Sequence, residues 1–295
     1  MSNEGYHLVT PLEQLFYCTV RIETIDTEGR RFFGTAFRFD FSQLLGPTAR
    51  PQGIPVLVTN RHVLQDAEET IFHFNEQADD GRGFKPRSHF PVRIRGRSEF
   101  IFHPNANVDL CLIPMARIFV WMLASGYPIP FILHLAPESL VMDFTVLRPI
   151  EEVVMVAYPN ALWDELNNLP IVRKGSTATL PTVNFQGWEE FLIDAACWWG
   201  SSGSPVFSLP PVSPDGSCMP KLLGVLYGGP TCALDGAVQA ANDSTAELTN
   251  EAQRILSMVP INIGYVIKAR ALLDFWPGIN EVVQRQIETG NIPTT

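Results

Sequence analysis

The sequence lacks any run of 18 apolar residues, so it contains no segment able to cross a membrane as a helix. Its first residues, MSNEGYHLVTPLEQ, combine no basic stretch with an apolar one, and we therefore expect no signal peptide. Basic residues are also few, because 21 Lys and Arg against 31 Asp and Glu give a net charge of −10. So negative a surface repels phosphate groups, and we expect no nucleic acid and no membrane among the partners.

Cysteine is scarce as well. Five cysteines form an odd set without any C-x-x-C pair, which argues against a disulfide framework and against a zinc site. Such usage favours a reducing compartment, and we expect a cytoplasmic protein. The densest basic stretch, residues 82–97, alternates charged with apolar side chains and predicts a strand with one solvated face.

What is present favours a large all-β core. The 295 residues suit one sizeable domain or two tightly packed halves, and 46% hydrophobic residues supply ample core material. The 21 Gly and 24 Pro are spread along the chain, as in proteins with many short strands joined by turns. Residues 18–25 and 31–41 flank a turn and predict a hairpin, and another strand is expected at 144–150. Together with many similar segments they predict paired antiparallel barrels.

We expect these barrels to form a single domain. The first barrel is predicted over about residues 12–117, a crossover over 118–140, and the second barrel over about 141–277. Helices are expected at the periphery. An apolar stripe along residues 244–256 predicts one, and residues 268–276 predict another that closes the second half.

A serine flanked by glycines stands in the segment Gly-Ser-Ser-Gly-Ser-Pro, residues 200–205. Glycines around Ser202 let the backbone turn sharply, expose the hydroxyl and allow successive N–H groups to point at one spot. The apolar residues after Pro205 predict a strand, which would hold the serine on a stiff element. An ordinary Gly/Ser loop has the same composition, so the motif needs partners elsewhere in the chain.

A serine nucleophile needs a base that titrates near pH 7, which usually means histidine. None of the six histidines follows Ser202, and this excludes the α/β-hydrolase order, in which the histidine comes last. His62 comes just after the apolar run VLVTN, so its imidazole is expected at a strand end beside a cleft. A structural, hydrogen-bonded role is the alternative for His62. The other histidines are expected in strands, turns, the crossover or the terminus: His7, His73, His89, His103 and His134.

The third partner should be a carboxylate buried enough to hold the imidazole in one tautomer. Asp109 directly precedes the apolar run LCLI, and a carboxylate so placed needs a partner because burying it alone is costly. A turn cap is the alternative for Asp109. Asp66 competes for the role, although we expect it to face solvent on the helical turn after His62.

The three blocks VTNRHV around His62, NVDL around Asp109 and GSSGSP around Ser202 resemble those of trypsin-like peptidases of the chymotrypsin fold. HtrA-type bacterial members are the most similar. The resemblance runs over about residues 14–277 and includes GTAF, AYP, GVLYGG and GYVIKARALLDF. It implies two six-stranded antiparallel barrels with a C-terminal helix, and we expect no PDZ module within this chain.

The resemblance also implies a serine endopeptidase that acts on protein or peptide substrates without a metal or cofactor. Ser202 would attack the scissile carbonyl, His62 would take its proton, and Asp109 would orient the imidazole. The N–H groups of Gly200 and Ser202 would form the oxyanion hole.

By the same resemblance, Ala196 aligns with the floor of the substrate pocket, and Tyr227 and Gly229 lie on the strand that pairs with substrate. An uncharged floor disfavours basic side chains and favours an apolar residue before the cleaved bond. Trp198 and Trp199 are expected either to line this pocket or to pack in the core.

The sequence departs from the family pattern at several positions. Ser201 stands where secreted zymogens carry an aspartate that pairs with a new N-terminus, so we expect control by a regulatory partner or by homo-oligomerisation. Ser204 replaces the usual second glycine, and Tyr227 replaces the usual serine. Residues 231–260 exceed the corresponding family loop, and we expect a helix there that acts as a lid or partner surface, with mere decoration as the alternative.

Two other functions stay open at this point. A non-catalytic binding protein on the same scaffold is supported by the departures at positions 201, 204 and 227. A different hydrolase is the second, either an esterase or a subtilisin-like order of Asp40, His62 and Ser202. The subtilisin-like order lacks the glycine expected after His62.

Overall fold

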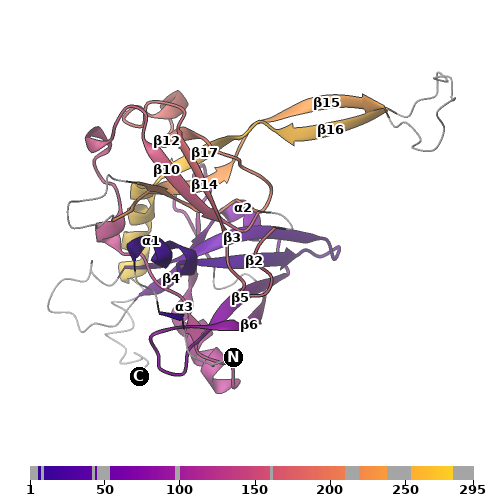
Figure 1. Ribbon diagram of the computed structural model, residues 1–295, viewed down its shortest axis with the longest axis vertical. Helices are drawn as coiled ribbons and strands as arrows, with labels where there is room; N and C mark the ends of the chain where they lie inside the picture. The colour runs from indigo at the N-terminus through magenta and orange to yellow at the C-terminus, as the bar shows by residue number, and fades with distance from the viewer. Residues whose placement is uncertain are drawn as a thin grey trace.

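The computed structural model describes residues 6–7, 10–41, 44, 54–96, 100–159, 162–209, 219–237 and 254–281. Antiparallel strands dominate this part of the chain and form two bodies packed against each other (Figure 1). A two-stranded ribbon leaves the second body and projects away from it (Figure 1). Within the described residues, no helix is long and apolar enough to cross a membrane.

The first body is one antiparallel sheet. Its strands are β1 Tyr6–His7, β2 Thr19–Ile25, β3 Arg31–Asp40, β4 Pro55–Thr59, β5 Glu69–Gln77, β6 Gly83–Arg95, β7 Ile101–Phe102, β8 Cys111–Pro114 and β9 Pro130–Phe131. They follow the order β1-β6-β5-β2-β3-β4-β8-β7, and β9 pairs with β5. The predicted hairpin is confirmed, because β2 and β3 pair antiparallel across the turn between them.

The second body is a closed barrel in the order β10-β11-β12-β17-β14-β13. Its strands are β10 Glu152–Ala157, β11 Ile171–Thr177, β12 Glu190–Asp194, β13 Pro205–Ser208, β14 Lys221–Gly228 and β17 Ile263–Lys268. The projecting ribbon consists of β15 Thr231–Ala237 and β16 Arg254–Pro260, which pair antiparallel. In the sequence, the ribbon is therefore inserted between the barrel strands β14 and β17.

Helical segments are short and lie around the strands. They are α1 Pro11–Gln14, η1 Leu15–Tyr17, α2 Arg61–Leu64, α3 Met115–Ala124, η3 Pro137–Ser139, η4 Phe144–Val146, η5 Phe185–Gly187 and η6 Ala269–Phe275, with helix continuing over 276–281. Thr10 caps α1, since its hydroxyl accepts the Glu13 N–H while the Glu13 carboxylate accepts the Thr10 N–H.

The prediction of an all-β, chymotrypsin-like fold with a C-terminal helix is confirmed. The second half has the six strands expected of it, in a closed barrel. The first half contains nine strands, because three two-residue edge strands, β1, β7 and β9, add to six longer ones. The expected boundaries at residues 117 and 141 stay a prediction, and α3 lies across the first of them.

Two local predictions are wrong. The expected strand at 144–150 begins instead with the 3₁₀ turn η4, which Asp143 caps by accepting the Thr145 N–H at 2.9 Å. The expected helix at 244–256 is contradicted at its end, where β16 pairs with β15 and satisfies its backbone groups that way. The earlier part of that prediction lies outside the described residues.

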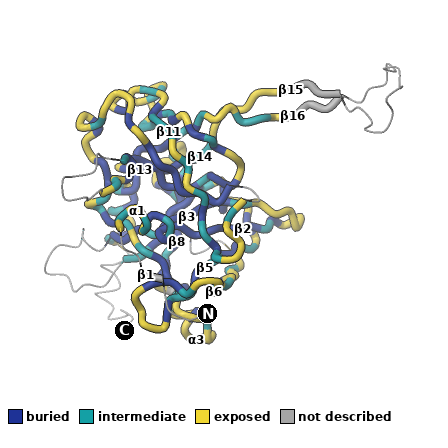
Figure 2. The backbone as a smooth tube through the Cα atoms, viewed as in Figure 1, coloured by how far each residue is buried: buried dark blue, intermediate teal, exposed yellow. Residues whose placement is uncertain are grey.

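The largest buried cluster runs through both bodies. It joins Phe37 and Phe39 on β3 to Phe207 on β13 and Val225 on β14. Smaller clusters fill each body separately. Figure 2 shows buried residues concentrated in the two bodies, whereas the described part of the ribbon is exposed or half-buried. Because removing apolar surface from water stabilises the contact, this shared core holds the two bodies in a fixed relation.

Candidate active site

His62 and Asp109 are brought together by the pairing of two neighbouring strands. In the β4–β8 ladder Thr59 lies opposite Cys111. His62 follows Thr59 at the start of α2, and Asp109 precedes Cys111, so an antiparallel register places both side chains at the same end of the sheet. The position of each therefore depends on strand geometry within the first body alone.

The contact between them is double. The Asp109 carboxylate accepts the backbone N–H of His62 at 3.0 Å, and its other oxygen lies 2.5 Å from His62 Nδ1. The Asn60 side-chain amide donates to the Asp109 carbonyl at 2.7 Å. A carboxylate at Nδ1 favours the tautomer with a proton there, which leaves Nε2 as an acceptor. His62 is 43% exposed at its side chain, so Nε2 is accessible.

Ser202 comes from the second body, on the loop between β12 and β13, and the first body holds this loop. The Thr35 N–H donates to the Ser202 carbonyl at 2.8 Å, and the Thr35 hydroxyl donates to the Gly200 carbonyl at 3.0 Å. That hydroxyl also accepts the Tyr158 N–H at 3.0 Å. Thr35 is fully buried, so these bonds are shielded from water.

The backbone of this loop requires glycine. Gly203 has φ +85°, and a Cβ there would lie 2.0 Å from the Thr35 carbonyl oxygen and 2.5 Å from the Thr59 hydroxyl. Gly200 also has a positive φ of 87°. Both the left-handed conformation and the contact with Thr35 exclude larger residues at position 203.

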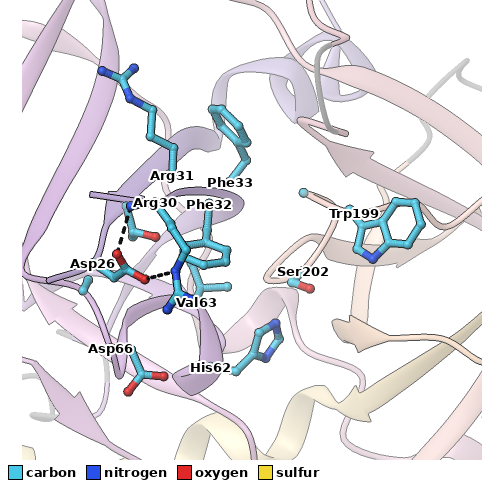
Figure 3. A pocket seen from close by; sticks show the side chains of 13 residues that line it. Asp26, Arg30, Arg31, Phe32, Phe33, His62, Val63, Asp66, Trp199 and Ser202 are labelled. Carbon is cyan, nitrogen blue, oxygen red and sulfur yellow. Dashed lines mark hydrogen bonds and ion pairs between the residues drawn. The ribbon is translucent and has the colours of Figure 1, made fainter. Parts of the chain in front are cut away.

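His62 and Ser202 line the same two cavities, and Figure 3 shows both side chains at the larger one. In this structure the Ser202 hydroxyl donates to the Tyr227 carbonyl at 3.3 Å. Among the described residues, no hydrogen bond joins Ser202 to His62, and neither the Gly200 N–H nor the Ser202 N–H has a partner. The serine is thus close to its expected base but turned toward β14.

The larger cavity has a volume of about 460 Å³ and reaches from the two catalytic candidates toward the β2–β3 turn. Phe32 and Trp199 lie on either side of Ser202 in Figure 3 and are 50% and 56% exposed. Asp66, which competed with Asp109 in the sequence, lines this cavity and bonds only Gln65 among the described residues. Of these two carboxylates, only Asp109 is hydrogen-bonded to His62 among the described contacts.

The smaller cavity, of about 230 Å³, contains part of the predicted substrate pocket. Tyr227 and Gly229 line it, as do Cys197 and Trp198. Ala196 is half-buried and lines neither cavity, whereas the next residue, Cys197, lines the smaller one. Burial raises the pKa of the Cys197 thiol to about 11, so this cysteine stays protonated near neutral pH and is a poor nucleophile.

Tyr227 is anchored by its side chain as well as by its strand. Its hydroxyl donates to Glu190 Oε2 at 2.8 Å, and its ring stacks on Tyr265 with centroids 5.7 Å apart. Burial raises the pKa of the Glu190 carboxyl above its usual range. These contacts fix the main chain that faces Ser202.

The two serines that depart from the family pattern, Ser201 and Ser204, are both buried. Ser201 is 1% exposed and Ser204 fully buried, and neither hydroxyl has a hydrogen-bond partner within the described part of the chain. Position 201 therefore offers no carboxylate for an ion pair like that of secreted zymogens. Asp40 accepts the Ile54 N–H at 3.0 Å and is 7% exposed, so its described contact is structural.

Thr35 is the site residue that the sequence did not indicate. It stands in the GTAF strand motif, where a threonine is ordinary, and only the packing of the two bodies reveals the three hydrogen bonds that join it to the second body. In the part of the chain that the structure describes, no group of three His, Cys, Asp or Glu side chains could hold a metal ion.

Residues 42–209 match the family model described as "Trypsin-like peptidase domain". Among curated proteins, no sequence matches the chain.

Solved structures similar to this one include several proteases. The HtrA-type protease AlgW with tripeptide is 14% identical with a TM-score of 0.47, and the match covers 95% of this chain and 63% of that one. This chain therefore spans less than two thirds of the AlgW chain. Tobacco vein mottling virus protease is 14% identical (TM-score 0.44), with 90% and 83% covered. The active form of Rv3671c protease from M. tuberculosis is 15% identical (TM-score 0.41), with 89% and 80% covered.

Proposed function

Because the chain belongs to the trypsin-like peptidase family, we propose that it is a serine endopeptidase with Ser202 as nucleophile, His62 as general base and Asp109 as the orienting group. The observation that carries this proposal is the double contact from Asp109 to His62, beside a cavity that both His62 and Ser202 line. Its substrates are proteins or peptides, and neither nucleic acid nor membrane takes part.

The reaction begins with a rotation of the Ser202 hydroxyl. It leaves the Tyr227 carbonyl and turns toward His62 Nε2, which accepts its proton as the oxygen attacks the scissile carbonyl. Asp109 stabilises the resulting imidazolium through Nδ1. His62 then protonates the leaving amine, and a water activated by the same imidazole hydrolyses the acyl-enzyme.

The oxyanion of the tetrahedral intermediate is held by the N–H groups of Gly200 and Ser202. These two groups are free of other partners among the described residues, and Thr35 holds the loop that carries them. Each such donor contributes roughly 3 kcal/mol to transition-state stabilisation.

The residue before the cleaved bond is proposed to be apolar. Its side chain would enter the smaller cavity, which Tyr227 and Gly229 line together with Cys197 and Trp198. None of these lining side chains is charged at neutral pH. Ala196 was expected at the floor, and we propose that it supports the cavity from behind Cys197.

A cytoplasmic location and control without a zymogen cut complete the proposal. Four described cysteines carry free thiols, Cys18, Cys111, Cys197 and Cys232, in keeping with a reducing compartment. Because Ser201 offers no carboxylate, activity is controlled by a regulatory partner or by homo-oligomerisation.

A peptide-library cleavage profile tests the function directly. The native chain should cut after apolar residues, and the Ser202→Ala chain, verified as folded by circular dichroism, should not. Cleavage that persists in Ser202→Ala would refute the assignment of Ser202 as the nucleophile. Cleavage after basic residues would contradict only the proposed preference for an apolar residue before the cleaved bond.

A second candidate function is a non-catalytic binding protein on this scaffold. The observation that favours it is the hydrogen bond of Ser202 to Tyr227 rather than to His62. A folded native chain that binds library peptides without cleaving any of them would establish this alternative.

A further inference from the structure

The ribbon β15–β16 continues the strand pair β14–β17 of the barrel. Gly228 pairs with Tyr265, the Ile261 N–H donates to the Pro230 carbonyl at 3.3 Å, and Thr231 pairs with Pro260. Close packing fills the junction, because a Cβ on Gly229 would lie 2.1 Å from the Ile263 carbonyl oxygen. The two strands therefore run on together from the barrel wall into the ribbon.

Strand β14, which leads into β15, has a second edge that faces away from β17 and passes beside Ser202. On β14, the side away from β17 meets β13 and then the nucleophile loop, where the Gly203 N–H donates to the Leu226 carbonyl at 2.8 Å. Next along this edge, the Tyr227 carbonyl accepts the Ser202 hydroxyl. From Gly228 to Ala237, no backbone hydrogen bond forms on this edge within the described residues.

This free edge opens from the cleft itself. Thr231 and Pro260, at the base of the ribbon, line the smaller cavity together with His62 and Ser202. Thr231, Cys232 and Ala233 are all exposed. Unpaired strand edges add further strands readily, and a two-stranded ribbon gains stability when a third strand covers it.

We propose that β15 is an extended binding edge for the polypeptide that precedes the scissile bond. This inference rests on the proposed function, since it starts from a substrate strand paired beside Tyr227. The substrate continues antiparallel past Gly229 and adds a strand to Thr231–Ala237, so residues upstream of the cleaved bond run outward along the ribbon. Seven further residues of β15 extend the contact by about 23 Å.

This geometry selects a class of substrate. Main-chain hydrogen bonds to a strand edge need an extended, unpaired segment rather than a particular side chain. The protease therefore favours unfolded or loosely structured polypeptides with a long free stretch before the cut. The occupant of the edge is the substrate itself, because the edge begins at the nucleophile and leads away from it.

The test compares substrates that differ only in upstream length. Lengthening a substrate from about four to about ten residues before the cleaved bond should raise kcat/KM about ten- to hundredfold, through a handful of added backbone bonds. The same lengthening after the bond should have no such effect. In a chain whose residues 232–259 are replaced by a short Gly-Ser turn, which keeps Thr231 and Pro260 at the cavity, the upstream gain should fall below about twofold.

The shortened chain must still cleave the short substrate and react with a fluorophosphonate, which separates this proposal from the catalytic one. If it retains both activities together with the full upstream gain, the edge is not used. If lengthening gives the native chain no gain, the proposal fails while the catalytic assignment stands.

Cys232 provides a second test that leaves the ribbon intact. A peptide phosphonate attached to Ser202, with a cysteine moved through its upstream positions, should form a disulfide with Cys232 by exchange with oxidised glutathione. The yield should peak at about the sixth residue before the phosphonate and vanish in Cys232→Ser. A flat yield, or a ribbon-dependent dimer in light scattering, would show that the substrate does not occupy this edge.

Discussion

The two halves of the molecule hold their catalytic candidates in different ways. His62 and Asp109 belong to one sheet, and the β4–β8 register alone brings them into contact. Ser202 belongs to the barrel, yet its loop is held by Thr35 of the opposite half. The base and its acid are therefore a local unit, whereas the nucleophile depends on the contact between halves. Changes at that contact should affect the serine loop first.

The largest expected effect comes from breaking the local unit. Asp109→Asn keeps the size of the side chain but favours the wrong imidazole tautomer, and kcat should fall about 10⁴-fold. Asp40→Asn is the matched control, because Asp40 caps the Ile54 N–H instead. Its kcat should stay within a few-fold of the native value. Equal losses in both variants, or a larger loss in Asp40→Asn, would favour the subtilisin-like order.

A Gly203→Ala change disturbs the contact between the serine loop and Thr35 of the other half. The added Cβ meets the Thr35 carbonyl at 2.0 Å at a positive φ, so the loop must shift away from the oxyanion position. We expect kcat to fall about 10²- to 10³-fold, as on loss of an oxyanion donor. Gly29→Ala is the control, since Gly29 has φ +77° but nothing within 4 Å of its Cβ position. It should cost about 1 kcal/mol of stability and no activity.

Removing the Thr35 hydroxyl should have a smaller effect in the same direction. Thr35→Val leaves the Gly200 carbonyl and the Tyr158 N–H without their partner, so kcat should fall about 10- to 100-fold and stability by about 2 kcal/mol. Thr70→Val is matched, because the buried Thr70 hydroxyl has no partner within the described residues. A kcat for Thr35→Val equal to that of Thr70→Val would contradict a role for Thr35 in the site.

The smallest expected effect is on stability at acidic pH, and it arises in the first half of the molecule. Burial lowers the pKa of His73 in the first half to about 3, with Arg21, His89 and Arg93 adding to it and the Glu23 carboxylate 3.5 Å away opposing it. The unfolded chain takes up this proton near pH 6.5 and the native chain only near pH 3, so stability falls as the pH drops through that interval.

At pH 4.5 the loss assigned to His73 should be about 3 kcal/mol in urea unfolding. His73→Gln should remove this part of the pH dependence, and His134→Gln, at an exposed histidine that does not contribute to the His73 shift, should not. Parallel pH profiles for the native chain and His73→Gln would rule out the buried imidazole as its source.

The sequence predicted the fold and the catalytic candidates where local patterns were strong. Two strand-like segments on either side of the turn at residues 26–30 indicated a hairpin. The motif around Ser202, together with the absence of later histidines, directed attention to His62. Asp109 stood out because a carboxylate beside an apolar strand needs a partner. Its contact with His62 has the geometry that this argument requires.

The sequence could not predict features that depend on packing between distant segments. Residues 254–260 carry an apolar pattern that suits a helix as well as a strand, and pairing with β15 decides the outcome. Thr35 is ordinary until the barrel loop lies against it. The cavity beside Phe32 and Trp199 likewise forms only where the two halves meet.

The central claim is that His62 activates Ser202, and intact-mass spectrometry after reaction with a fluorophosphonate tests it most directly. The native chain should gain one probe at Ser202, Ser202→Ala should gain none, and His62→Ala should react at least about 10³-fold more slowly. A folded native chain that stays unlabelled, or one labelled at another serine, would contradict the account.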